Sequence, residues 1–159
     1  MTTDPIRETD DEARALARRL IEEARFGALA VLDPQTGFPA VSRVAVGPGP
    51  EGGLFTLISG LSAHSRALGQ DPRAGLLLGE PGKGDPLAHP RLSLQLRAHP
   101  LPDTDPRRAA LRARWLADHP KAQIYIDLPD FFFVEFEILA GALNGGFARA
   151  YRLTADDLT

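Results

Sequence analysis

The sequence predicts a mainly β, single-domain fold in which six or more mostly antiparallel strands form a barrel with peripheral helices. Short apolar segments recur along the 159 residues and are separated by Gly- and Pro-rich turns. Helical periodicity is confined to a few inserts and does not alternate with every strand, which disfavours a βαβ sheet. The length fits one domain with one hydrophobic core, so we treat residues 1–159 as a single unit.

An amphipathic helix is predicted first, after residues 1–10, which we expect to be flexible. Apolar residues recur at helical spacing over 13–24, Thr9 and Glu12 have the spacing of a capping box, and Gly27 ends the pattern. Segments 28–32 and 39–46 then predict a hairpin, because Asp, Pro and Gly between them favour a tight turn.

The middle of the chain predicts further strands around a short helix. A Gly/Pro cluster at 47–53 is followed by a strand over 54–59, a helix over 62–68 and a strand over 74–78. Since the last of these strands is almost entirely apolar, we expect both of its faces to be buried.

The second half of the chain shows clearer alternation. Leucines alternate with polar residues over 91–98, which predicts a strand with one packed face. Asp105 as N-cap and Pro106 at the first helical position predict a helix to about residue 118. A strand is predicted over 131–139, and the glycines within 141–146 are expected to end or bend it.

The composition excludes several classes of function. The chain has no cysteine, which excludes disulfides, thiolate nucleophiles and Cys-ligated zinc or iron–sulfur clusters. A net charge of −3 disfavours nucleic-acid binding. No apolar run approaches the ~18 residues of a membrane span, and the acidic N-terminus does not resemble a signal peptide. We therefore expect a cytoplasmic protein with no nucleic-acid or membrane partner.

Most catalytic and metal motifs are missing as well. The glycine clusters lack the spacing of dinucleotide and P-loop sites, and no G-x-S-x-G is present. Three of the four histidines precede proline and none forms an H-x-H or H-x-x-x-H pair, so we expect no metal site. A haem iron needs only one histidine as axial ligand, so the lack of histidine pairs does not exclude haem binding. No catalytic residue is assigned.

The segment 55–66 is the best candidate for an anion site. It places hydroxyls, His64 and Arg66 where a strand meets a helix N-terminus, where free N–H groups and the helix dipole favour an anion. From the residues alone, a plain Ser62 helix cap with a solvated His64 is the more favoured interpretation. Arg43 and Arg91 could each bind a phosphate through two N–H groups of the guanidinium, or could simply face solvent.

Several motifs in order and spacing resemble a known family. They are Pro-Ala-Val-Ser-Arg-Val at 39–44, Phe-Thr-Leu-Ile-Ser at 55–59 with Ser-Ala-His-Ser-Arg-Ala-Leu at 62–68, and Gln-Asp-Pro-Arg-Ala at 70–74. Together they resemble the pyridoxamine 5'-phosphate oxidase-like FMN-binding proteins. Pro-Arg-Leu-Ser-Leu at 90–94 and Gly-Gly-Phe-Ala-Arg-Ala at 145–150 are similar to the haem-utilisation branch of that family.

The resemblance implies a split β-barrel that forms a homodimer with FMN at the subunit interface. It implies flavin contacts from two strands, phosphate contacts at the helix start, and a loop of the other subunit over the ring. The implied cofactor-binding residues are Ser42, Arg43, Val44, Thr56, Leu57, Ser59, Ser62, His64, Ser65, Arg91, Gly146 and Phe147. One departure stands out, because Ala63 and His64 occupy the positions of an Arg-Lys pair in the oxidases.

Three functions follow from these observations. The first is an FMN-dependent oxidoreductase that transfers hydride between the flavin and an unidentified small-molecule substrate or electron donor. The second is a non-catalytic flavin-binding or sensing module. Haem binding or breakdown ranks last, since only the branch resemblance supports it.

Overall fold

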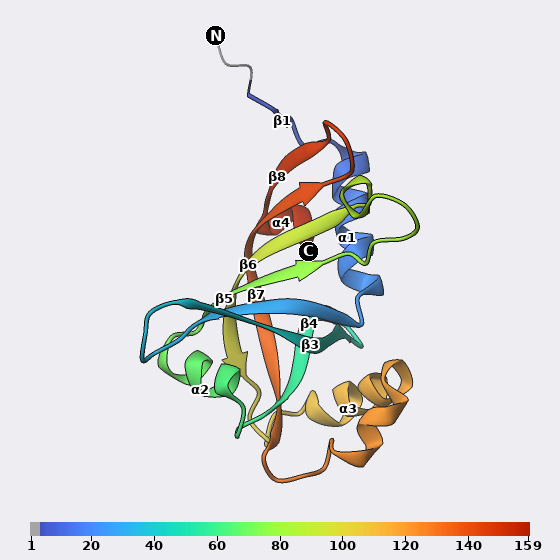
Figure 1. Ribbon diagram of the computed structural model, residues 1–159. Coiled ribbons are helices and arrows are strands. Elements are labelled where there is room, and N and C mark those ends of the chain that lie inside the picture. The colour runs from blue at the N-terminus through green and yellow to red at the C-terminus, as the bar shows by residue number, and fades with distance from the viewer. Residues whose placement is uncertain (1–3) are drawn as a thin grey trace.

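Eight strands form one sheet in the computed structural model, which describes residues 4–159 (Figure 1). The strands are β1 (Ile6–Arg7), β2 (Phe26–Leu32), β3 (Pro39–Gly49), β4 (Gly52–Ser59), β5 (Arg73–Leu78), β6 (Arg91–Pro100), β7 (Phe131–Asn144) and β8 (Ala150–Thr154). Their order is β1-β8-β7-β4-β3-β2-β5-β6, and β6 also pairs with β7. That last pairing closes the strands from β7 round to β6 into an antiparallel barrel, as the sequence predicts.

The barrel is split at β7 and again between β3 and β4. Residues 131–135 of β7 pair with β4, whereas residues 140–144 pair with β8, and β6 occupies the other edge of β7. Strands β3 and β4 pair only from Val46 and Thr56 to their hairpin turn. Beyond that point the two strands diverge, and their facing edges do not pair with one another.

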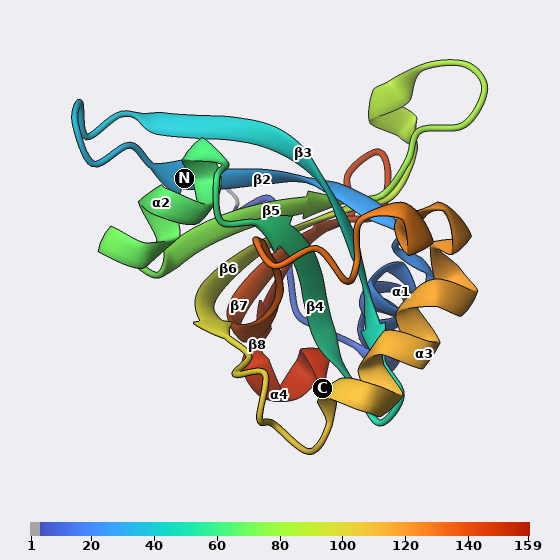
Figure 2. The same cartoon turned by 90° about the horizontal axis from the view of Figure 1, so that it is seen from below.

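Helices pack around the barrel without separating its strands. They are α1 (Asp11–Glu23), α2 (Ala63–Gln70), α3 (Arg108–Asp118) and α4 (Ala155–Leu158), with short 3-10 turns at Pro86–Ala88 and Pro120–Ile124. In both views α2 and α3 lie on opposite sides of β4 (Figures 1 and 2). None of the helices in residues 4–159 combines the length and apolar character that crossing a membrane requires.

Two hydrophobic clusters fill the structure. The barrel interior contains the alternate leucines of β6, which are buried as predicted while Ser93, Gln95 and Arg97 are exposed. A second cluster lies outside the barrel wall, where Phe55 and Phe133 pack against Leu111 and Trp115 of α3. Strand β4 is therefore buried on both faces, as is β7 at Phe133 and Val134, and α3 is fixed to the outside of the barrel.

Several predicted boundaries were wrong for local reasons. Asp10, not Thr9, caps α1 by accepting a hydrogen bond from the Ala13 N–H at 2.8 Å, and Thr9 Oγ1 instead donates to the Arg152 carbonyl. Helix α1 ends at Glu23, and β2 already includes Phe26. In β5 the expected burial of both faces fails, because Leu77 is 46% exposed.

Differences in the second half have similar causes. Asp105 accepts a hydrogen bond from the Arg107 N–H in a turn that precedes α3, so the helix begins at Arg108. Strand β7 runs through Gly141 to Asn144, since β6 and β8 pair with both of its edges there. Of the N-terminal residues expected to be flexible, residues 1–3 lie outside the described part of the chain, and Ile6–Arg7 pair in parallel with β8.

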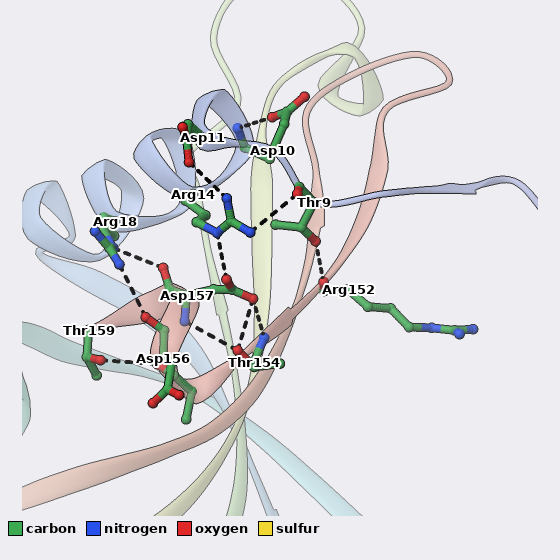
Figure 3. A network of polar contacts seen from close by, with 12 residues as sticks. Thr9, Asp10, Asp11, Arg14, Arg18, Arg152, Thr154, Asp156, Asp157 and Thr159 are labelled. Carbon is green, nitrogen blue, oxygen red and sulfur yellow. Dashed lines mark hydrogen bonds and ion pairs between the residues drawn. The ribbon is translucent and has the colours of Figure 1, made fainter.

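A polar network joins the N-terminal helix to the C-terminal one (Figure 3). Arg14 Nε donates to Asp157 Oδ1 at 2.7 Å, and Arg18 Nε donates to the Asp157 carbonyl at 2.9 Å. Asp157 also forms a capping box with Thr154 at the start of α4. The side-chain hydrogen bond from Arg14 is the main reason that the pKa of Asp157 falls to about 2.

Candidate functional site

A cavity of about 370 Å³ lies between the β2–β3 hairpin and the first turn of α2. Its size is at the low end of the range for small-molecule sites, about 300–1,000 Å³. Apolar side chains form most of its wall, and the polar residues around it include one cation and one imidazole. The lining comprises Val31, Pro34, Ala40, Val41, Ala63 and Ala67, together with Asp33, Gln35, Ser42, His64 and Arg66.

The turn before α2 is held by hydroxyl groups. Ser62 caps the helix by accepting from the Ser65 N–H at 3.3 Å. The Ser59 carbonyl lies 2.7 Å from Ser62 Oγ and 2.5 Å from Ser65 Oγ, and both hydroxyls are oriented to donate to it. Each serine has a single hydroxyl proton, so both protons are used inside the turn.

The N–H groups of Ala63 and His64 are left at this helix start. Within residues 4–159 no protein acceptor pairs with either of them, as is usual for the first turn of a helix. An anion in the cavity would therefore meet two main-chain donors and the helix dipole rather than seryl protons. The phosphate contacts implied for Ser62 and Ser65 would require both hydroxyls to rotate.

Asp130 anchors the same turn from a distant part of the sequence. Ser59 Oγ donates to Asp130 Oδ2 at 2.6 Å and accepts from the Leu61 N–H at 3.1 Å. The Asp130 carbonyl accepts from the Gly60 N–H at 2.7 Å. These bonds fix the β4–α2 connection, and hence one wall of the cavity, to the segment before β7.

His64 is half-buried at the cavity wall. Its Nδ1 lies 3.3 Å from Ser42 Oγ, so the first turn of α2 is joined to β3 at this point. Burial lowers the pKa of His64 below its usual value of 6.5, which keeps the imidazole neutral at neutral pH. In the described chain His64 Nε2 has no hydrogen-bond partner.

Arg43 lies on the other face of β3 from Ser42, as strand alternation requires. Its guanidinium sits 5.7 Å from the centre of the Phe26 ring and lines a second, open cavity of about 690 Å³. The structure therefore brings Ser42 and His64 together and separates both from Arg43.

Val44, Thr56 and Leu57 are buried side chains. Val44 belongs to the barrel core and Leu57 to the cluster under α3. Thr56 Oγ1 donates to the Ala45 carbonyl at 2.7 Å, just where the β3–β4 pairing ends. A ligand between the diverging strands would contact their main-chain edges rather than these side chains.

Arg91, Gly146 and Phe147 form a separate group beside the β7–β8 connection. Arg91 pairs with Asn144 in the β6–β7 ladder and donates to the Leu87 carbonyl at 3.1 Å. Gly146 has φ +120°, and a Cβ there would lie 3.2 Å from the Ala88 carbonyl. Figure 1 shows this connection and α2 at opposite ends of the molecule. One chain therefore does not bring the twelve predicted residues together: Ser42 and His64 meet beside α2, Arg43 lines the second cavity, Val44 and Leu57 are buried in separate clusters, and Arg91 lies beside the β7–β8 connection.

Apolar side chains are exposed on the outer face of the β3–β2–β5 part of the sheet. Phe26 of β2, Val41 of β3 and Leu77 of β5 all project from the barrel there, and Phe38 precedes β3. Val41 is 67% exposed and Phe147 is 77% exposed. In residues 4–159 no three His, Asp or Glu side chains gather as metal ligands.

The fold and cavity define a split-barrel protein with a small-molecule site beside α2. No family model matches the chain. One solved structure, 52% identical, matches 96% of this chain and 98% of its own with a TM-score of 0.87. The haem-binding protein of Mycobacterium smegmatis is 30% identical and matches 94% of this chain and 61% of its own with a TM-score of 0.82.

A curated relative gives a similar result. The haem oxygenase HOZ of Arabidopsis thaliana is 29% identical over 72% of this chain, which spans only 34% of that protein's length. A protein of the pyridoxinephosphate oxidase family from Clostridium acetobutylicum shares the fold at 14% identity and a TM-score of 0.71. This chain therefore shares the split-barrel fold of solved proteins that include pyridoxinephosphate-oxidase-family and haem-binding members.

Proposed function

We propose that this protein binds haem against the exposed apolar face beside the β2–β3 hairpin, with the cavity next to α2 taking only part of the group. The observation that carries the proposal is the chemistry of the cavity wall, which is mainly apolar and contains one neutral, half-buried imidazole. A porphyrin makes apolar contact over most of its surface, and an imidazole nitrogen is one of the usual protein ligands of its iron. Arg66 supplies one cation for a propionate.

Similarity to haem proteins supports this choice. Haem appears in the names of the Mycobacterium smegmatis and Arabidopsis thaliana relatives, which are 30% and 29% identical to this chain. This chain spans only 61% and 34% of these two proteins, so we propose haem binding for it and do not propose haem breakdown. Haem binding, which ranked last from the sequence alone, is therefore our first candidate function.

We also propose that two copies of the chain complete the site. A homodimer would bring Phe147 of one copy toward the cavity of the other, which one chain cannot do because the two regions lie at opposite ends (Figure 1). The exposed Phe26, Phe38, Val41 and Leu77 supply apolar surface for such an interface.

FMN is the second candidate, and a different observation favours it. The N–H groups of Ala63 and His64 point out of the first turn of α2, and the unpaired edges of β3 and β4 could hydrogen-bond a flavin ring. A bound flavin would supply the hydride chemistry of an oxidoreductase acting on a small-molecule substrate, or the response of a sensing module. Against it stand the missing Arg-Lys pair and the engaged seryl protons.

Parallel titrations with haemin and FMN test both candidates. We expect haemin to produce a Soret band that saturates at one equivalent per chain, and FMN fluorescence to change little. Quenched FMN fluorescence without a Soret band would favour the flavin, and no response to either would reject both. As a positive control, the double substitution Ala63→Arg with His64→Lys should increase FMN affinity by restoring two cations.

A further inference from the structure

We propose that Ser42 and His64 form a catalytic dyad that hydrolyses small carboxylic esters in the cavity beside α2. Ser42 is the nucleophile, His64 is its general base, and the N–H groups in the first turn of α2 stabilise the oxyanion. This activity goes beyond haem binding and does not require it.

The hydrogen bonds of the five serines single out Ser42. Its hydroxyl lies 3.3 Å from Nδ1 of His64, and both residues line the cavity. The other four hydroxyls are engaged elsewhere or lie on another surface: Ser59 donates to a carboxylate, Ser62 and Ser65 donate to the Ser59 carbonyl, and Ser93 is exposed on β6. In the described chain, Ser42 is therefore the serine whose proton faces a base.

The contact between Ser42 and His64 has the arrangement of an activated nucleophile. A serine hydroxyl attacks a carbonyl readily only when an adjacent base takes its proton. In the tautomer with the proton on Nε2, His64 Nδ1 accepts a hydrogen bond from the Ser42 hydroxyl. The distance of 3.3 Å slightly exceeds the range of about 2.6–3.2 Å for such pairs, which are often longer before substrate binds. The two residues are 22 positions apart, on β3 and α2, so no local sequence motif reveals the pair.

The surroundings of His64 keep its imidazole able to accept a proton. Burial lowers the pKa of His64 below its usual value of 6.5, so the ring is neutral at neutral pH. The two charged side chains that also line the cavity are bonded to main-chain groups, since Asp33 accepts from two N–H groups of its own turn and Arg66 donates to the Leu61 carbonyl. His64 is therefore the cavity group that takes the seryl proton.

The start of α2 supplies donors for the negative charge that forms on the substrate. The N–H groups of Ala63 and His64 have no protein acceptor within residues 4–159, and both residues line the cavity. Main-chain N–H groups at a helix N-terminus, together with the helix dipole, stabilise the oxyanion of a tetrahedral intermediate. The cavity thus combines a nucleophile, a base and oxyanion donors.

The reaction proceeds in two balanced halves. Ser42 Oγ bonds to the carbonyl carbon while its proton passes to His64 Nδ1, and the carbonyl electron pair moves onto the oxygen to give the oxyanion. When the C=O bond forms again, the ester C–O bond breaks and the leaving alcohol takes the proton from His64. Water then repeats both steps on the acyl-serine, which releases the carboxylic acid and returns the proton to Ser42.

The size and wall of the cavity define the substrate class. Its volume of about 370 Å³ is at the low end for small-molecule sites. Short apolar side chains form most of the wall, and they include Val31, Ala40, Val41 and Ala67. We therefore assign esters with a short acyl chain as substrates, and p-nitrophenyl acetate serves as the probe.

The first test measures hydrolysis of p-nitrophenyl acetate by the parent protein, Ser42→Ala, His64→Gln and the matched control Ser93→Ala. We expect Ser42→Ala and His64→Gln each to lower kcat/KM at least about tenfold. This is the lower end of general-base effects, because within residues 4–159 no carboxylate orients the His64 ring. Ser93→Ala should match the parent protein. Haemin is left out of every assay, so a failure of haem binding does not affect the result.

A covalent probe separates the dyad from hydrolysis by surface groups. Diisopropyl fluorophosphate should bond through phosphorus to Ser42 Oγ with loss of fluoride, and peptide mass spectrometry should find the adduct on Ser42. Labelling should be slower in His64→Gln, which keeps a polar side chain but removes the base. Because this probe works on the parent protein, the assignment can be tested even where a variant does not fold. Hydrolysis at the parent rate by Ser42→Ala, or no adduct on Ser42, overturns the proposal and leaves haem binding untouched.

Discussion

Replacing Asp130 with alanine should loosen the turn that carries the wall of the cavity. Asp130 accepts a charge-assisted hydrogen bond from Ser59 Oγ at 2.6 Å. Hydrogen bonds to charged groups contribute about 1.5–3 kcal/mol, and partial exposure of the carboxylate reduces this to roughly 1–2 kcal/mol here. For a domain of this size that loss lowers Tm by about 2–8 °C.

Thermal unfolding followed by circular dichroism measures the effect, and hydrogen exchange localises it. Exchange of the Leu61 N–H should accelerate, because it donates to Ser59 Oγ, which loses its own bond to the Asp130 carboxylate. The Gly60 N–H donates to the Asp130 main-chain carbonyl, which the substitution keeps, and should change less. The control Asp130→Asn keeps an acceptor oxygen and should recover part of the loss. If the alanine variant melts with the parent protein and its turn exchanges at the parent rate, the anchoring role is refuted.

Three further predictions test the core, the interface and the terminal network. Leu94→Ala should cost about 2–5 kcal/mol in denaturant unfolding, since Leu94 is 1% exposed inside the barrel, and a smaller loss would mean that the barrel collapses around the cavity. Val41→Glu should keep the circular dichroism spectrum of the folded chain, since Val41 is 67% exposed, but shift sedimentation toward monomer; a persistent dimer contradicts the proposed interface. Asp157→Asn should lower Tm above about pH 4 and converge with the parent as the pH falls toward 2, because the depressed pKa of Asp157 stabilises only its ionised form. A constant difference at every pH would exclude that mechanism.

The parts of the fold that sequence could predict are those set by local periodicity. The alternating leucines of β6 identified both the strand and its buried face. The predicted end of β7 was wrong at Gly141, because a glycine in a strand pattern indicates a break unless the neighbouring strands are known. In the structure Leu94 and Leu153 pair with Gly141 from opposite edges, and a Cβ there would lie 3.0 Å from Leu158.

Long-range pairing also explains the elements that were missed. Strand β1 is two residues long and exists only because β8, more than 140 residues later, offers its edge. Helix α4 has four residues, and contacts from Arg14 and Arg18 stabilise it. Segments this short have no periodicity, and their structure depends on partners that are distant in sequence.

In the candidate site, too, local patterns predicted some features, and contacts between distant residues determined the others. A capping serine before a short helical pattern predicted the start of α2, and the spacing placed His64 in its first turn. Strand alternation could separate Ser42 from Arg43 but could not say which of them faces the cavity. Asp130 gave no signal, because its contact with Ser59 spans 71 positions and depends on closure of the barrel.

Ala63 and His64, which the sequence resemblance sets against an Arg-Lys pair of the oxidases, affect what the cavity would attract. Two permanent cations at a helix N-terminus would favour a phosphate dianion, whereas alanine and a neutral imidazole leave only the main-chain dipoles and Arg66. Those dipoles act on any anion, so they do not select a phosphate over a carboxylate. The remaining specificity lies in the apolar wall and in the free Nε2 of His64, and both are properties that a porphyrin uses and a phosphate group does not.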